Sequence, residues 1–112
     1  MDIVTPDQII QALAEIRAEA EKGIEAQYHA EVELAHKSAE ADRVESAAFL
    51  RIDGLVSDRQ ALAKLESAQS REEMDLSRAK LNRIKLKLNQ LNQAQSALQT
   101  QARMVELTYK TA

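Results

Sequence analysis

The sequence has no cysteine, one proline, two glycines and three aromatic side chains in 112 residues. The absence of cysteine excludes disulfides, thiolate metal ligands and a cysteine nucleophile. Because β-sandwiches and barrels need a turn about every 10 residues, a chain with so little glycine and proline is not expected to form one. The shortage of aromatic side chains also argues against a thick globular core, since these side chains supply much of its volume.

Long apolar runs and catalytic motifs are missing as well. No run approaches the roughly 18 apolar residues of a membrane span. The N-terminus lacks the basic region and apolar run of a signal peptide, so we expect a cytoplasmic protein. There is no glycine-rich phosphate loop and no serine at a motif spacing from histidine and aspartate. We therefore expect no enzyme activity, no cofactor and no small-molecule substrate.

What the sequence does contain is typical of long helices. Hydrophobic residues make up 45% of the chain, but 19 of them are alanine. Alanine and leucine combined with abundant Glu, Gln, Lys and Arg are the composition of coiled coils. The composition therefore predicts an all-α protein.

Start and stop signals divide the chain into two helices. Thr5 and Gln8 fit a capping box around Pro6, which favours a first helix over residues 6–53. Gly54 fits the left-handed position after a helix end, where Leu50 and Leu55 are expected to make the accompanying apolar contact. Ser57 then repeats the start signal, so a turn over 54–57 and a second helix over 58–109 follow.

These two helices are nearly equal in length, with 48 and 52 residues. Equal lengths around a short connection predict an antiparallel helical hairpin, with residues 1–112 as a single domain. The alternative is one unbroken helix that tolerates Gly54, at a cost of about 1 kcal/mol.

Apolar residues mark the face of each helix. In the first helix they recur about every 3.6 residues and include Ile9, Leu13, Ile16, Ala20, Ile24 and Tyr28. In the second helix they form a coiled-coil seam with a seven-residue repeat, interrupted by Gln95. Before residue 81 Leu62, Leu65 and Leu76 leave this repeat, which suggests a stutter. The seam consists of Leu81, Ile84, Leu88, Leu91, Leu98 and Val105.

A second apolar row lies beside this seam and includes Leu86, Met104 and Leu107. Contact between two helices needs only one seam, so the second row predicts a further partner. We expect two hairpins to dimerise into a four-helix bundle, with the seam and the second row as interface residues. The uncharged, amide-rich segment 89–101 is either ordinary solvated helix surface or a docking face for a partner.

Charge is unevenly distributed, with −7 over residues 1–53 and +6 over residues 76–112. In a hairpin that turns at 55–56, residue i lies opposite about residue 111 − i. The basic segment 78–87 then faces residues 24–33, which include Glu25, Glu31 and Glu33. Opposite charges beside a seam favour this orientation of the two helices.

Two alternative functions remain at this stage. Glu33 and His36 have the Glu-x-x-His spacing of di-iron bundle proteins, although a solvated charged stripe in a Glu-rich chain explains the match equally simply. A basic face can bind nucleic acid, but this one lacks aromatic residues for stacking and the chain has a pI of about 5.4. The basic face consists of Arg78, Lys80, Arg83, Lys85 and Lys87.

No motif is specific enough to name a family. Helical hairpins of this shape occur among secretion chaperones, phage accessory proteins and filament subunits, which is an analogy of shape only. The leading hypothesis is a non-enzymatic interaction or assembly protein, an adaptor, chaperone or structural subunit whose partner is a protein or a second copy. The alternatives are a metal-binding helical bundle and a nucleic-acid-binding protein.

Overall fold

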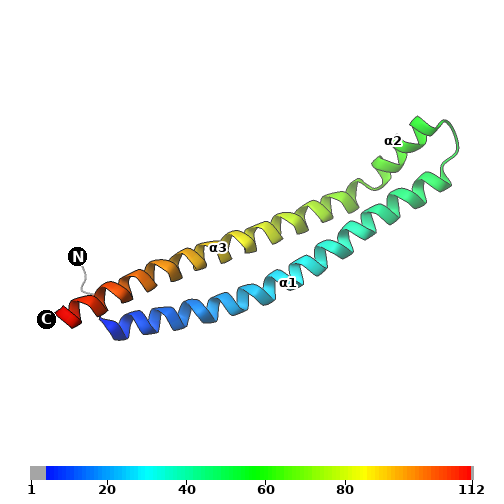
Figure 1. The fold of residues 1–112 in the computed structure, drawn as a ribbon. Coiled ribbons are helices and arrows are strands. Elements are labelled where there is room, and N and C mark those ends of the chain that lie inside the picture. The colour runs from blue at the N-terminus through cyan, green and yellow to red at the C-terminus, as the bar shows by residue number, and fades with distance from the viewer. Residues whose placement is uncertain (1–4, 112) are drawn as a thin grey trace. The chain divides into compact units, whose positions relative to one another are not determined.

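The protein is all-α. The computed structural model describes residues 5–111, which form the helices α1 (Pro6–Arg51), α2 (Val56–Glu66) and α3 (Ala68–Thr111) (Figure 1). Residues 5–111 contain no strand, as the composition predicts. None of these three helices has an apolar stretch long enough to cross a membrane.

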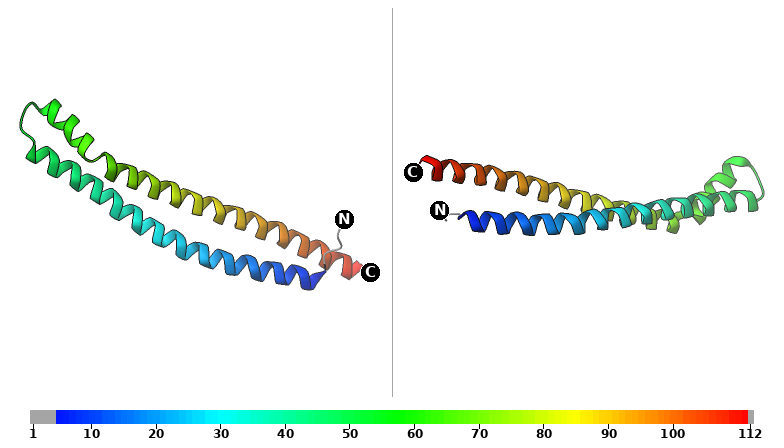
Figure 2. Two further views of the ribbon diagram at one scale, coloured as in Figure 1. Left: turned by 180° about the vertical axis from the view of Figure 1, so that it is seen from behind. Right: turned by 60° about the horizontal axis from the view of Figure 1, so that its bottom comes forward.

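The chain divides into two compact units. The terminal unit comprises Met1–Ala26 and Ile84–Ala112, and the turn unit comprises Gln27–Arg83. In the terminal unit the first part of α1 lies beside the last part of α3, blue beside orange and red in Figures 1 and 2. In the turn unit the later part of α1 lies beside α2 and the first part of α3.

The paired helices run antiparallel in each unit. In the terminal unit Gly23 meets Leu88, and Ile9 shares a groove with Val105. In the turn unit ion pairs join Glu33 to Lys80, Glu45 to Arg71 and Arg51 to Glu66. The alternative of one unbroken helix is wrong, because α1 ends at Arg51 and α2 begins at Val56.

The predicted capping box at the start of α1 is confirmed. The Thr5 amide donates to Gln8 Oε1 at 3.0 Å, and the Gln8 amide donates to Thr5 Oγ1 at 3.2 Å. These two bonds satisfy two amides that have no partner within the helix. The Ile9 amide then makes the first helical bond, to the Thr5 carbonyl at 3.1 Å.

The turn lies at residues 52–55 and not at 54–57. Gly54 has φ +125°, a conformation that side chains disfavour, and this explains a glycine here. The expected contact between Leu50 and Leu55 is not a buried one, because these side chains are 79% and 72% exposed. The N-cap of α2 is Leu55, without a side-chain cap bond, so the predicted cap at Ser57 is wrong.

The end of α1 is held by an arginine that the sequence did not reveal. The Arg59 guanidinium donates to the Phe49 carbonyl at 2.7 and 3.2 Å and lies 4.2 Å above the Phe49 ring. It thereby satisfies one of the carbonyls left open at a helix C-terminus.

The expected single second helix is interrupted at Ser67, where α2 ends and α3 begins one residue later. Ser67 has φ −88° and ψ 3°, and its hydroxyl donates to the Lys64 carbonyl at 3.1 Å. A serine hydroxyl that bonds the backbone in this way competes with regular helical geometry. Backbone bonds of 3.0 Å continue on both sides, so the interruption is a local bend of the backbone.

Candidate interaction surfaces

Large apolar side chains form the seam of the terminal unit. On both helices the buried and half-buried positions alternate in steps of three and four residues, the 3.5-residue period of a coiled coil. They are Ile9, Leu13, Ile16, Ala20 and Gly23 on α1, and Ile84, Leu88, Leu91, Gln95, Leu98, Ala102 and Val105 on α3.

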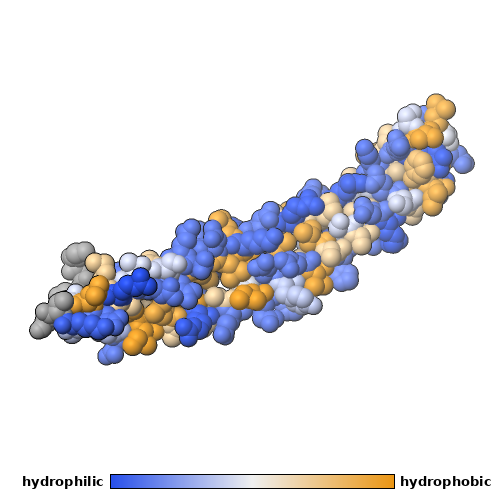
Figure 3. All heavy atoms as spheres, in the orientation of Figure 1, coloured by the Kyte–Doolittle hydropathy of each residue, from blue (hydrophilic) through white to orange (hydrophobic). Residues whose placement is uncertain are grey.

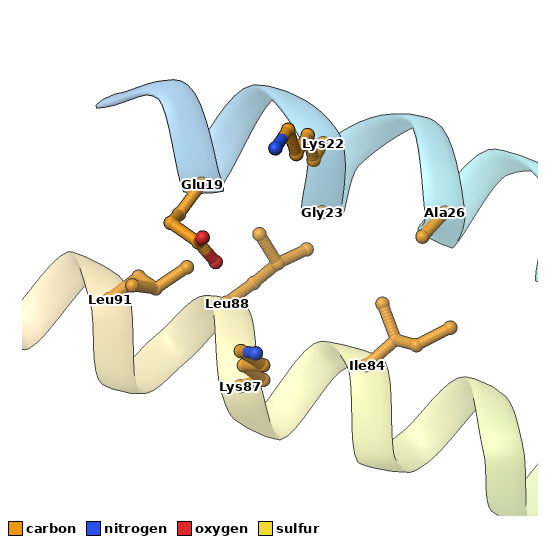
Figure 4. A pocket seen from close by; sticks show the side chains of 8 residues that line it. All are labelled: Glu19, Lys22, Gly23, Ala26, Ile84, Lys87, Leu88 and Leu91. Carbon is orange, nitrogen blue, oxygen red and sulfur yellow. The ribbon is translucent and has the colours of Figure 1, made fainter. Parts of the chain in front are cut away.

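Gly23 and Leu88 face one another across this seam. Figure 4 shows Leu88 pointing from α3 toward Gly23 on α1. A Cβ at position 23 would lie 2.4 Å from Leu88 Cδ2 and 3.1 Å from Leu88 Cγ. The glycine therefore leaves the space that the leucine side chain fills, which accounts for the one glycine inside a helix.

The face predicted for the first helix is partly wrong. Ile24 and Tyr28 are both exposed, and the seam passes through Gly23 and Gln27 instead. A period of 3.6 residues and one of 3.5 residues diverge by only about 20° per heptad, so the shift from Gly23 to Ile24 comes mainly from the choice of the apolar residue. The apolar character of Ile24 and Tyr28 favoured the longer period, although the partner helix α3 follows the shorter one.

The seam of the turn unit holds mainly small and polar residues. The period of 3.5 residues persists below residue 81, so the expected stutter is wrong, and Leu62, Leu65 and Leu76 are exposed. The seam positions are Ala30, Leu34, Lys37, Ala41, Val44 and Ala48 on α1, and Ala63, Ser67, Ser70, Met74, Ser77 and Leu81 on the opposite side.

Charged side chains bridge the helices of the turn unit. Lys37 meets Glu73 at 3.3 Å, and Lys80 meets Glu33 at 3.3 Å. Arg71 is more buried than these, and it binds both Glu45 on α1 and the Ser67 hydroxyl. The pairing of the acidic first half with the basic last third is therefore present at Glu33 and Lys80, close to the predicted register.

The metal candidates Glu33 and His36 lie in the turn unit, whereas the basic candidates are divided between the two units, with Lys85 and Lys87 in the terminal unit. Glu33 is half-buried in its ion pair with Lys80, and His36 is exposed. Among residues 5–111 there is no group of three or more metal-ligating side chains. Of the five basic residues, Arg78 pairs with Asp75 at 3.2 Å and Lys80 pairs with Glu33.

Glu40 and Arg43, a further pair on α1, change each other's pKa. A hydrogen bond from the Arg43 guanidinium lowers the pKa of Glu40, and the same bond raises the pKa of Arg43. Both side chains are exposed, so this pair belongs to the helix surface and not to a buried site.

The nine predicted interface residues divide into two groups. Leu81 is buried, with 5% exposure, and the other five seam residues are half-buried against α1. Leu86, Met104 and Leu107 instead remain 58%, 65% and 57% exposed. A helix turns about 100° per residue, so these three lie on the side of α3 that faces away from α1.

We call this exposed side of α3 in the terminal unit the outer row. Its positions also alternate in steps of three and four residues, and none of them is charged. Residues 88–102 around it contain no charge either. The outer row consists of Leu86, Gln90, Gln93, Ala97, Thr100, Met104 and Leu107, all of them exposed.

A second exposed apolar cluster lies at the turn, where the sequence did not predict a surface. Figure 3 shows hydrophobic atoms gathered at this end of the turn unit. The sequence interpretation assigned Leu62 and Leu65 to a slipped seam and Leu50 and Leu55 to a contact at the helix end, which is why the cluster was missed. Its members are Leu50, Leu55, Val56, Leu62 and Leu65.

Comparisons with protein-family models, with curated proteins and with solved structures found no match to this chain. The interaction surfaces must therefore be interpreted from their own chemistry.

Proposed function

We propose that this protein is a non-enzymatic interaction protein, an adaptor, chaperone or assembly subunit that works by binding other protein chains. The observation that supports this most is the outer row. Scattered single hydrophobic residues are normal on a surface, but a periodic row with coiled-coil spacing is the pattern by which helices recognise helices. A dimer of two hairpins, forming a four-helix bundle, is the simplest assembly that this row allows.

The lack of charge on this face supports the same proposal. A helix side that only contacts water usually has charged residues, because they favour solubility. Interfaces are depleted of charge at their centre. An uncharged row of leucine, methionine, alanine and amides therefore suits a surface that is covered in the working protein.

The test compares two variants with equal added charge. Leu86, Met104 and Leu107 are changed to Glu in one variant. Asn89, Asn92 and Gln99, which are exposed on the same helix but outside the row, are changed to Glu in the control. Tagged and untagged chains are co-expressed, and all proteins that co-purify in stoichiometric amounts are quantified by mass spectrometry.

We expect the wild-type chain and the control to retain a bound protein chain, either the untagged copy or another protein. The outer-row variant should lose it while its helix content, measured by circular dichroism, is unchanged. Equal capture by the outer-row variant would contradict the proposal, and so would the absence of any stoichiometric partner for the wild type.

A further inference from the structure

The outer row has the spacing of a second coiled-coil seam, and its side chains are exposed. Its seven positions span three heptads of α3, and the side chains at both ends are large and apolar. Amides and small residues separate these ends. The row therefore suits a helix that has large apolar side chains at both ends of the contact and small or amide side chains between them. The occupant therefore needs a matching arrangement along about 22 residues.

We propose that the occupant is a second copy of this chain, whose α3 docks antiparallel on the outer row with a two-fold axis close to Ala97. This inference rests on the proposed function and names its partner. The row ends in Leu86 on one side and in Met104 and Leu107 on the other, so its apolar ends can pair with each other in an identical copy related by a two-fold axis.

Antiparallel pairing matches each side chain of the row with a suitable one. Leu86 lies opposite Leu107 of the copy, so apolar pairs close both ends. Gln93 lies opposite Thr100, where an amide and a hydroxyl can bond, and the small Ala97 side chains meet near the axis and allow close approach. Gln90 lies opposite Met104, whose flexible thioether adapts to irregular neighbours.

Charge determines the direction of the pair. The uncharged segment 88–102 is bounded by Lys87 on one side and by Arg103 on the other, with Lys85 before it and the ion pair of Glu106 with Lys110 beyond it. In a parallel pair, the two lysines of one copy would lie beside the same lysines of the other. In the antiparallel pair these lysines lie near Glu106 and Arg103 lies near the uncharged Gln90, so like charges meet only at Arg83 and Lys110.

Because the sequence has no cysteine, single cysteines test this arrangement without interference. A disulfide forms only where the Cα atoms come within about 7 Å. Leu86→Cys and Leu107→Cys are purified separately, and an oxidant is added to each alone and to a mixture of the two. Ala97→Cys and the off-row control Gln99→Cys are oxidised in the same way, and linked dimers are scored on non-reducing gels.

We expect Ala97→Cys to link to itself, because it lies near the axis. We also expect the mixture of Leu86→Cys and Leu107→Cys to link, while each of these alone and Gln99→Cys do not. Self-linking of Leu86→Cys would overturn the antiparallel arrangement. A wild-type chain with the mass of one copy by light scattering at high concentration would overturn the second copy as occupant.

The two proposals fail in different ways. If none of the cysteine variants links but the outer row still captures a different protein, the second copy is wrong and the proposed function stands. If the outer-row variant and the wild type capture the same proteins, the proposed function is wrong as well. Circular dichroism of each cysteine variant confirms that it is folded before its result is interpreted.

Discussion

The terminal unit and the turn unit share one seam period but fill it with different chemistry. In the terminal unit the seam is built from large apolar side chains such as Ile16, Leu91 and Leu98. In the turn unit the equivalent positions hold small residues such as Ala41, Ala48 and Ser67, all of them buried. A constant backbone register can therefore be maintained by bulk in one region and by close approach of small residues in another.

This difference changes what stabilises each unit. Burial of apolar area contributes about 25 cal/mol per Å², so large side chains dominate in the terminal unit. The ion pairs of the turn unit are mostly exposed, and such pairs contribute about 0–1 kcal/mol each. We therefore expect the turn unit to depend on its few larger buried groups and on the hydrogen bonding of its serines.

The largest effect is expected at Leu81, the bulkiest buried residue of the turn unit, with 5% exposure. Leu81→Ala should destabilise the fold by about 2–4 kcal/mol, because a buried leucine loses its contacts and leaves a cavity. The control Leu76→Ala lies on the same helix of the same unit but is 64% exposed, so it should cost less than about 0.5 kcal/mol.

Urea unfolding followed by circular dichroism measures both free energies, and hydrogen exchange shows which unit opens. Equal effects of Leu81→Ala and Leu76→Ala would mean that the turn unit does not bury Leu81 as described. In that case the side of α3 that holds Leu81 would be no more buried than the side that holds Leu76.

Replacing two buried serines of the turn-unit seam by alanine should change the free energy of unfolding in opposite directions. Within residues 5–111 the buried Ser77 Oγ has no hydrogen-bond partner, so Ser77→Ala should stabilise the protein by about 1 kcal/mol. The buried Ser67 hydroxyl bonds Lys64 and Arg71, so Ser67→Ala should destabilise it by a similar ~1 kcal/mol.

Unfolding in urea at neutral pH compares the two serine variants directly. If both substitutions stabilise, the higher helix propensity of alanine dominates and the hydrogen bonds of Ser67 contribute little. If both destabilise, Ser77 has a partner in solution, such as an ordered water.

The parts of this fold that the sequence predicted are those where strong local signals agree. Thr5 and Gln8 form the capping box because their spacing alone determines both bonds. The seam above residue 81 was visible because leucine, isoleucine or valine marks every repeat. Gly54 marked the turn, since few other residues adopt its backbone conformation.

The parts that could not be predicted depend on the partner helix. Below residue 81 the seam holds Ser77, Met74 and further serines and alanines, which hydrophobic periodicity does not detect. Ile24 was assigned to the core because it is apolar, whereas the space opposite belongs to Leu88. The cap from Arg59 to the Phe49 carbonyl likewise requires knowing how the turn brings the two side by side.

A smaller effect is expected at Gly23 in the terminal unit. Glycine to alanine in a helix interior normally gains about 1 kcal/mol. Here the added Cβ would press on Leu88, so Gly23→Ala should gain less than about 0.5 kcal/mol in the wild-type background. In the Leu88→Ala background, where that contact is absent, the same change should gain the full amount of about 1 kcal/mol.

A double-mutant cycle from urea unfolding measures this coupling. Strict additivity of Gly23→Ala and Leu88→Ala would show that the two residues do not touch in solution. The terminal seam would then be looser than a coiled-coil seam, and the contrast with the close-packed turn unit would become sharper.

The smallest expected effect concerns the exposed surface of the turn unit. The hydrogen bond from Arg43 lowers the pKa of Glu40, so the charged carboxylate is favoured in the folded state. This contribution to stability is therefore present above the pKa of Glu40 in the unfolded chain, and it is lost as the pH falls through the lower pKa of the folded protein.

Arg43→Gln should raise the pKa of Glu40 toward its usual value, which an NMR titration of the Glu40 carboxyl carbon detects. Because both side chains are fully solvated, unfolding curves at neutral pH should hardly change. A large loss of stability in Arg43→Gln would show that exposed ion pairs, rather than buried small residues, hold the turn unit together.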